Sequence, residues 1–395
     1  MNRIVVTGMG VISAIGNSVA ENRMSLIEGK CGISSLEMFP SKFSGTLPVG
    51  EIKISTDALK NKLAAHDPGI TRTTLLALHA MKEALADSRL TDSQIASSDT
   101  ALIGASTVGG MCLTDEMYAD SKEDVTHSAY LSSYDYSATA MYLQKLYSIA
   151  GPVNTINTAC SSSANAIMYA ARLIRSGRVK RAIASGFDSL AKFTINGFNA
   201  LHILSDLPCT AFDENRKGLN LGEGAAFLIL EKEEDAVGKK IYAALSGYSN
   251  TNDAFHASSL SDDGVGPYKA MKDALAVANL DPSKIDFINA HGTGTENNDQ
   301  VESVAMLRLF KNVPAFASTK ANTGHTLGAA GAIEALYCIL NLAEQELYTG
   351  IHFTTPITGT RLQPILGYKK TALNHIMSNS FGFGGNCSSL IFSKA

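Results

Sequence analysis

The sequence predicts an α/β protein made of two halves that repeat one architecture, and three observations support this prediction. Continuous apolar runs alternate with helical patterns, which is typical of strands covered by helices on both faces. The chain has 395 residues, enough for two packed halves. The charged, turn-like stretch EKEEDAVGKK at 231–240 interrupts the alternation. We therefore expect one half over residues 1–235 and the other over residues 236–395.

The elements of the first half follow from short apolar runs and one amphipathic stretch. Strands are expected at RIVVTG, TALIGAS, RAIASGFD and GAAFLILE. Between the first two strands, TTLLALHAMKEALADS places Leu75, Leu78 and Leu85 at helical spacing. Because strands covered on both faces are typical of parallel sheets, a parallel sheet is expected.

The second half restarts the same order. It begins with the strand IYAALSGYS and the helix GPYKAMKDALAVANL, followed by the strand DFINAHG, a helix over about 299–310 and the strand PAFAS. The helix GAAGAIEALYCILNLAEQ and the closing strand segment HIMSNSFG…SSLIFS complete it. The comparable order in both halves indicates a pseudo-duplication.

Composition excludes several classes of function. The net charge of −4 argues against a nucleic-acid-binding surface. Six scattered cysteines without a C-x-x-C pair favour reduced thiols in a cytoplasmic protein over disulfides or a metal site. No stretch approaches the roughly 18–20 apolar residues of a transmembrane helix. The opening MNRIVVTGMGVISAIG is predicted to be a buried strand rather than a signal peptide, since threonine and glycines interrupt it.

Glycine-rich stretches invite a nucleotide-binding interpretation, which fails on spacing. TGMGVIS follows a predicted strand, but Ser13 stands where the G-x-G-x-x-G motif needs a glycine, and no phosphate-binding G-x-x-x-x-G-K-[ST] occurs.

The polar, tyrosine-rich segment 112–140 is long for a plain connection. It is predicted to be a functional cap or a partner contact, with a solvated loop as the alternative.

Cys160 is the first candidate for chemistry. It lies in NTACSSSANA, after a β-leaning run and before a helical stretch that ends near Gly177. A thiol at a helix N-terminus meets peptide dipoles that favour the thiolate, so we expect a thiol that ionises near neutral pH. The alternative is that Cys160 is one more small buried hydrophobe.

Two histidines stand in unusual surroundings. His291 in NAHGTGTENND follows an apolar strand, and His325 in STKANTGHTLGAAG precedes a helix of small residues. Flanking glycines let a backbone approach a ligand closely, and threonine hydroxyls can bind it. Strand ends in α/β folds collect such groups, although each histidine alone could serve packing. A papain-like protease is excluded because its C-G-S-C-W neighbourhood is missing and the chain has no tryptophan.

Four blocks together resemble a known family. NTACSSSANAI, NAHGTGTENNDQVES, STKANTGHTLGAAGAIEA and NSFGFGGNCSSLIF resemble, in order and spacing, the signature blocks of β-ketoacyl-[acyl carrier protein] synthases, the elongating condensing enzymes of fatty-acid and polyketide synthesis. TAFDENRKGLNLGEGAAFLILE and NDAFHASS look like two further blocks. The resemblance implies a thiolase-like fold: two α/β/α halves around two five-stranded sheets, in five α-β-α-β-α layers.

The resemblance also implies roles for matching residues. Cys160 would carry the acyl chain as a thioester, and His291 and His325 would hold the incoming malonyl thioester. Phe383 would gate the site, its backbone N–H joining that of Cys160 in an oxyanion hole. The other matching positions are Lys320, the acidic residues Asp299, Glu302 and Glu334, the pantetheine-binding Thr293 and Thr295, and Val108 and Phe198 of the acyl pocket.

The implied reaction is a decarboxylative Claisen condensation that lengthens an acyl group by two carbons. It uses no cofactor and no metal, because the substrates travel on the phosphopantetheine arm of an acyl carrier protein. The implied assembly is a homodimer, or a heterodimer with a homologous chain-length-factor subunit, with no membrane partner. An acidic carrier needs a basic rim, for which the candidates are Lys60, Lys62, Arg72 and Arg216.

Departures from the family pattern keep alternatives open. Many relatives end one block with GFGGTN, whereas Asn386 and Cys387 follow GFGG here, so the gating loop is expected to move or bond differently. The neighbourhood of Cys387 does not match a degradative thiolase. HILS replaces an arginine-containing ALS motif and weakens one expected carrier contact.

The pathway and the form of the enzyme also stay open. TACSSS and HGTGT look more like polyketide synthases, so a polyketide or aryl-polyene pathway stands beside housekeeping elongation. A catalytic subunit that needs a chain-length partner is a further alternative. A non-catalytic scaffold of the same fold is disfavoured because the cysteine and both histidines are present.

Overall fold

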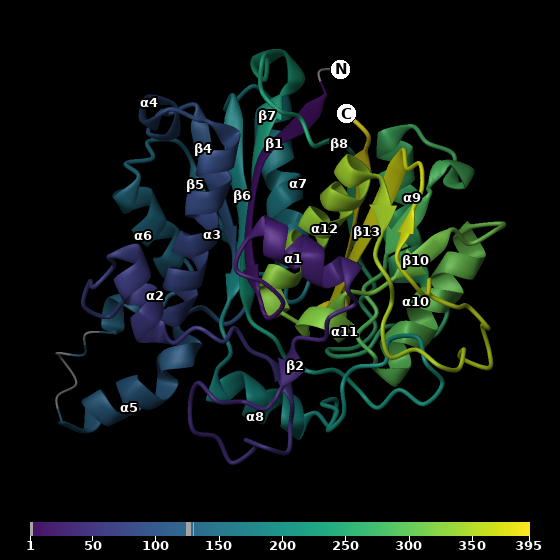
Figure 1. The fold of residues 1–395 in the computed structure, drawn as a ribbon, viewed down its shortest axis with the longest axis horizontal. Coiled ribbons are helices and arrows are strands. Elements are labelled where there is room, and N and C mark those ends of the chain that lie inside the picture. The colour runs from purple at the N-terminus through teal and green to yellow at the C-terminus, as the bar shows by residue number, and fades with distance from the viewer. Residues whose placement is uncertain (1–2, 124–127, 129) are drawn as a thin grey trace.

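The computed structural model describes residues 3–123, 128 and 130–395. Ten strands of this part of the chain form one mixed sheet in the order β10-β9-β13-β14-β8-β1-β7-β6-β4-β5 (Figure 1). Its strands are β1 (Ile4–Ser13), β4 (Thr100–Ala105), β5 (Val153–Ile156), β6 (Arg181–Asp188), β7 (Gly224–Lys232), β8 (Ala243–Asn252), β9 (Phe287–Asn289), β10 (Ala315–Ala317), β13 (His375–Gly382) and β14 (Asn386–Ser393). Two further pairs of short strands are β2 (Ile33–Ser34) with β3 (Val49–Gly50), and β11 (Glu346–Leu347) with β12 (Lys369–Lys370).

The sheet repeats one strand order twice. In each half the third strand of that half lies at the outer edge (β5 and β10) and the first strand lies at the centre (β1 and β8). The two central strands pair with each other, residues 4–6 against residues 243–245, in an antiparallel ladder. Each half thus contributes five strands, as expected, and this central pairing joins the two five-stranded sets edge to edge.

The predicted parallel sheet is only half right. In each half the three outer strands are parallel: β5, β4 and β6 on one side, and β10, β9 and β13 on the other. The four inner strands β7, β1, β8 and β14 run antiparallel to their neighbours. The prediction was partly wrong because an apolar run indicates that a strand is buried on both faces but not whether it runs parallel to its neighbours. Every residue of β1 is buried although this strand is antiparallel to both of its neighbours.

Helices form three layers around the two sets of strands, which confirms the thiolase-like fold. The middle layer holds α7 (Ser162–Arg175) and α12 (Ala330–Glu344), which pack on each other and on strands of both halves. Helix α3 (Arg72–Ser88) covers the outer face of the first half (Figure 1). Helices α9 (Val265–Ala278) and α10 (Glu296–Leu309) cover the second. The remaining helices are α1 (Val19–Ile27), α2 (Thr56–Leu63), α4 (Asp92–Ile95), α5 (Thr114–Glu123), α6 (Ala138–Leu146), α8 (Lys192–Ala200) and α11 (Lys320–Thr323).

One core segment meets the length and composition of a membrane span, which the sequence prediction overlooked. This segment, Leu327–Glu344, comprises α12 and the turn before it, and 89 % of it lies buried inside the molecule. A helix that is apolar on all sides fits a place between two layers, where α7 and both sets of strands surround it.

The segment 112–140 begins with the end of a 3₁₀ turn (Gly109–Leu113) and α5. The part of that prediction that falls on residues 124–127 and 129 lies outside the described residues. Among the described ones, Tyr118 and Leu131 are 63 % and 60 % exposed. A partner contact therefore stays a prediction for this segment.

Candidate active site

Cys160 lies on a sharp turn from a strand into a helix. β5 ends at Ile156 and α7 begins at Ser162, so five residues reverse the chain direction. Ala159 adopts a left-handed conformation with φ +53°, which is unusual for a residue with a Cβ and marks a tightly determined backbone. The turn places the Cys160 side chain, 5 % exposed, at the wall of a cavity and beside the N-terminus of α7.

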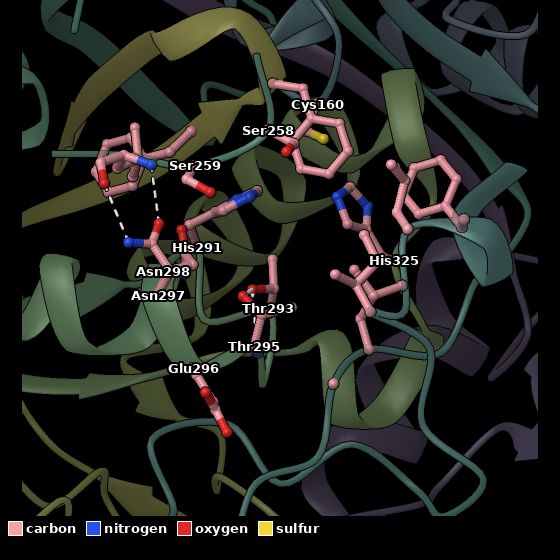
Figure 2. A pocket seen from close by; sticks show the side chains of 18 of the residues that line it. Cys160, Ser258, Ser259, His291, Thr293, Thr295, Glu296, Asn297, Asn298 and His325 are labelled. Atoms are coloured by element: carbon pink, nitrogen blue, oxygen red, sulfur yellow. Dashed lines mark hydrogen bonds between the residues drawn. The ribbon is translucent and has the colours of Figure 1, made fainter. Parts of the chain in front are cut away.

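The cavity has a volume of about 410 Å³ and draws its walls from both halves of the molecule. Cys160 comes from the first half, and His291 and His325 come from the second (Figure 2). The Cys160 Sγ and one nitrogen of each imidazole all lie within 4.8 Å of one another. The two rings stand 5.6 Å apart at 88°. The structure thus brings together three side chains that are separated by up to 165 residues of sequence.

The protonation of Cys160 differs from the sequence expectation of a thiol that ionises near neutral pH. Burial raises the pKa of this thiol to about 11, although the Lys320 charge and the backbone N–H groups of Phe383 and Cys160 lower it. The sequence expectation considered the helix N-terminus without the loss of water around a buried sulfur, which acts in the opposite direction. We therefore expect the resting thiol to be protonated.

Both histidines are neutral hydrogen-bond donors toward the cavity. The Nδ1 of His325 accepts the N–H of Leu327 at 3.1 Å, and the Nδ1 of His291 faces the Lys320 ammonium at 3.2 Å. With Nδ1 acting as acceptor, the proton of each ring sits on Nε2. Burial and the charge of Lys320 hold the pKa of both imidazoles well below the ordinary value. Each ring therefore offers an Nε2–H without carrying a charge.

The position of the proton on His291 and His325 also affects whether this site can bind a metal. A thiol and two imidazoles at this spacing are a possible metal-ligand set by distance. A metal, however, binds the unprotonated nitrogen of an imidazole. Because the Nδ1 contacts of His291 and His325 keep both Nε2 atoms protonated, the arrangement favours donation to an oxygen over coordination of an ion.

Lys320 and Glu334 form a buried ion pair behind His291. Lys320 Nζ also donates to the His291 carbonyl at 2.6 Å, and the lysine is only 1 % exposed. Burial raises the pKa of Glu334, and the lysine charge lowers it. A pair with no access to water depends on both partners, because either one alone would be an uncompensated buried charge.

Glu302 and Asp299 hold the backbone of the HGTGT loop. The Glu302 carboxylate accepts the N–H groups of His291 and Gly292, each at 2.9 Å. Asp299 accepts the N–H groups of Gly294 and Phe212. Burial raises the pKa of Glu302 to about 7 and also raises that of Asp299. Both residues lie behind the loop, so they orient it and do not reach the cavity.

Hydroxyl and amide groups line the cavity on the side away from Cys160. Thr293 and Thr295, which share a hydrogen bond of 2.8 Å, lie beyond the imidazoles in Figure 2. Asn297 exchanges two hydrogen bonds with the backbone of Leu260, at 2.8 and 3.0 Å. Sequence reasoning missed the wall residues Ser258, Ser259, Asn297 and Asn298. The available signal was their position within NDAFHASS and GTGTENND.

The predicted gate and acyl-pocket residues lie at one end of the cavity. Phe383 stacks on Phe198 with ring centroids 5.7 Å apart and planes at 17°. Both phenylalanines line the cavity, whereas Val108 is buried in an adjoining apolar cluster with Leu190 and Ile195. Val108 therefore lies behind the observed wall. Asp188, which sequence reasoning also missed, accepts the N–H of Val108 at 3.1 Å and so fixes this cluster's position.

Two of the proposed carrier-docking cations are engaged elsewhere. Arg72 pairs with the buried Glu223 at 2.6 Å, and its side chain is 12 % exposed. Arg216 donates to the backbone carbonyls of Thr295 and Glu296 at 3.2 and 2.8 Å. Both arginines hold the fold, which sequence alone did not reveal because their partners are distant in the chain. Lys60 and Lys62 remain candidates for docking.

The fold and the cavity define a thiolase-fold enzyme of acyl transfer, and comparisons with known proteins agree. Residues 1–236 match the family described as Beta-ketoacyl synthase, N-terminal domain, and residues 242–354 match Beta-ketoacyl synthase, C-terminal domain. The chain therefore belongs to the β-ketoacyl synthase family and is an enzyme of the acyltransferase type.

Similar proteins cover the whole chain. A putative mitochondrial 3-oxoacyl-[acyl-carrier-protein] synthase of Schizosaccharomyces pombe is 34% identical over 428 residues, covering 100% of this chain and 99% of the relative. The solved structure of the ishigamide ketosynthase/chain length factor has a TM-score of 0.93 at 26% identity, covering 100% and 99%. The ketosynthase ApeO in complex with its chain length factor ApeC from Xenorhabdus doucetiae gives a TM-score of 0.87 at 31% identity, covering 100% and 98%.

Proposed function

We propose that Cys160 takes an acyl group from an acyl carrier protein and that the chain then extends it with malonyl-carrier. The observation that carries this proposal is the approach of the Cys160 Sγ and two imidazole nitrogens within 4.8 Å in one cavity. This places a nucleophile opposite two neutral donors, and a carbon–carbon condensation between two thioesters needs both.

The first step loads the enzyme. Sulfur of Cys160 attacks the acyl thioester carbonyl, and the backbone N–H groups of Cys160 and Phe383, which both lower the pKa of this thiol, stabilise the oxyanion. The intermediate collapses with loss of the carrier thiolate, which takes the proton that the cysteine gives up. The products are acyl-Cys160 and a free carrier thiol.

The second step makes the new bond. The malonyl carbon–carboxylate bond breaks, carbon dioxide leaves, and the electron pair forms an enolate whose oxygen accepts the Nε2–H groups of His291 and His325. The enolate carbon attacks the acyl-Cys160 carbonyl, and Cys160 leaves as a thiolate that regains a proton. The product is a 3-oxoacyl-carrier two carbons longer. Decarboxylation supplies the carbanion, so no cofactor or metal enters the scheme.

Other residues support these steps. Lys320 holds the tautomer of His291, and Glu302 and Asp299 hold its loop, as their contacts indicate. Thr293 and Thr295 are placed to bind the phosphopantetheine arm, since their hydroxyls line the cavity beyond the imidazoles. Phe198 would border the acyl chain, with Val108 behind it.

The partners follow from the similar structures. Two of them pair a ketosynthase with a chain length factor, and one contains an acyl carrier protein with its ketosynthase. We propose an acyl carrier protein as the substrate carrier, and a dimer formed with a second copy or with a chain length factor. The free thiols of Cys31, Cys160, Cys209, Cys338 and Cys387 fit a location in the reducing cytoplasm. The pathway is fatty-acid or polyketide synthesis.

The proposal is tested by product analysis. The purified chain is incubated with a panel of acyl-carriers and malonyl-carrier, and the carrier-bound products are measured by mass spectrometry. A 3-oxoacyl product two carbons longer supports the proposal, and the preferred acyl donor separates fatty-acid from polyketide synthesis. Absence of product from both the chain alone and the chain co-expressed with a chain length factor would contradict it. Size-exclusion chromatography of the same samples gives the form of the dimer.

A further inference from the structure

Asn386 stands at the base of the loop that carries Phe383. In the β13–β14 hairpin Gly382 pairs with Asn386, so the loop between them has only three residues, Phe383–Gly385. Gly384 and Gly385 both have φ +79°, a conformation suited to glycine, which lets the loop turn within this length. The position of Asn386 therefore decides where the backbone N–H of Phe383 lies.

The side chain of Asn386 joins this loop to the turn that carries the nucleophile. Its Oδ1 accepts hydrogen bonds from Ser161 Oγ at 2.7 Å, Asn165 Nδ2 at 2.9 Å and Asn250 Nδ2 at 2.6 Å. Ser161 follows Cys160 directly, and Asn165 lies in the first turn of α7. The Asn386 amide oxygen thus accepts hydrogen bonds from the start of α7 and from β8, which fills its capacity as an acceptor.

The loop and the turn also meet backbone to backbone. A Cβ placed on Gly382 would lie 2.7 Å from the Thr158 carbonyl oxygen and 3.1 Å from the Cys160 nitrogen. The N–H groups of Phe383 and Cys160 both act on the same sulfur and lower the pKa of its thiol. One donor belongs to the hairpin and the other to the turn, so any shift between these elements separates the two donors.

We propose that Asn386 is a positioning residue for the oxyanion hole. Its amide oxygen fixes the base of the hairpin to the first turn of α7 and so sets the spacing of the two N–H donors. This role rests on the proposed function, because the spacing matters only where an acyl group is transferred to Cys160. A threonine at this place would carry its oxygen one bond closer to the backbone, too short to reach all three donors.

The test compares three reactions in the wild type, N386T and N386A. Acyl transfer from an acyl-carrier to Cys160 is followed by quenched mass spectrometry, and we expect it to slow about 10- to 100-fold, below the full loss of an oxyanion donor. The decrease is expected in kcat rather than in KM. Decarboxylation of malonyl-carrier without an acyl donor uses no oxyanion at Cys160 and should stay within about twofold. Alkylation of Cys160 by iodoacetamide should slow less than acyl transfer, because the Phe383 N–H affects it only through the pKa of the thiol.

Ser388 offers a matched control in the same polar network. Its Oγ donates to Asn165 at 2.8 Å and accepts from Asn250 at 2.9 Å, whereas the loop base is held by Asn386. S388A should therefore transfer acyl groups at close to the wild-type rate, with any loss confined to thermal stability. Equal slowing in S388A, or slowing of decarboxylation in parallel with transfer in N386T, would reduce Asn386 to a structural role.

The outcomes separate this inference from the proposed function. A wild type that is acylated on Cys160, beside an N386T variant that is acylated as fast, overturns the role of Asn386 and leaves the proposed function standing. A wild type that takes no acyl group on Cys160 overturns both.

Discussion

The two halves of the molecule share one topology and place different chemistry at matching points. Cys160 follows the third strand of the first half, β5, and precedes α7. His325 follows the third strand of the second half, β10, and precedes α12. His291 follows the second strand of its half, where the first half has the turn at Val108. One fold therefore supplies a nucleophile from one copy and hydrogen-bond donors from the other.

The surroundings of these groups differ in charge. Near Cys160 the side chains are neutral hydroxyls and amides, among them Ser161, Ser162 and Asn165, all buried. Behind His291 the second half buries Lys320, Glu334 and two further carboxylates. The difference teaches that the first half surrounds its thiol with neutral groups, while the second half places the fixed charge of Lys320 against the Nδ1 of His291. Variants in the first half should therefore impair acyl transfer to Cys160, and variants in the second half should impair decarboxylation.

The largest expected effect separates these reactions. C160A should lower condensation by more than about 10⁴-fold, because the acyl thioester has no atom to form on. Decarboxylation of malonyl-carrier should persist in C160A, since its donors belong to the second half. Condensation by C160A at a rate close to that of the wild type, followed by product mass, would show that the halves are not divided in this way.

Removing the charge of Lys320 behind His291 should lower both the stability of the protein and its decarboxylation rate. K320M leaves Glu334 as an unpaired buried charge and removes the partner of the His291 Nδ1, so we expect a loss of about 3–5 kcal/mol in stability. Decarboxylation should fall about 10²–10³-fold. The double variant K320M/E334L should recover most of the stability in thermal unfolding but not the decarboxylation rate. Recovery of both would make the ion pair purely structural.

The pH profiles of the two halves should differ in slope. Because the pKa of Cys160 is raised to about 11, the thiolate fraction, and with it the rate of alkylation by iodoacetamide, should rise about tenfold per pH unit from pH 7 to 10. Because the pKa values of both imidazoles are lowered well below the ordinary 6.5, both rings are already neutral there. Decarboxylation should therefore be flat above about pH 7.5 and should fall only as Glu302, whose pKa is raised to about 7, takes up a proton. An alkylation rate that levels off near pH 8 would show that the dipole of α7 outweighs burial.

The smallest effect concerns the contact that joins the halves at the gate. Phe198 of the first half stacks on Phe383 of the second, and F198L should lose about 0.5–1.5 kcal/mol of this contact. We expect a slightly lower Tm and a changed preference for acyl length, with alkylation of Cys160 unaffected. An unchanged acyl preference across the panel of carriers would place Phe198 outside the acyl path.

Much of this arrangement was predictable from local patterns. The run RAIASGFD predicted β6 with the bounds that the structure has. The glycines and threonines that follow two strands indicated His291 and His325 as site residues. The order of the blocks indicated the fold. Local patterns predict these features because the burial of a strand and the residue preferences of a turn both depend on residues that are close together in the sequence.

What depends on distant contacts was not predictable. The antiparallel centre of the sheet arises from pairing between β1 and β8, which are far apart in sequence. Arg72 was taken for a surface cation because Glu223, its partner, lies 151 residues away. The raised pKa of Cys160 reflects enclosure by both halves. Helix α10 begins at Glu296, a little before the expected start near 299, because Thr295 has extended dihedral angles and already acts as its N-cap.

The most direct test of the division between the halves is intact-mass analysis of one cycle. Wild-type enzyme mixed with an acyl-carrier should gain the acyl mass, with peptide mapping placing it on Cys160, and malonyl-carrier should then discharge it. The double variant H291A/H325A should gain the same mass and keep it after malonyl-carrier is added. Acyl mass on another residue, or discharge by the double variant as fast as by wild type, would contradict the account.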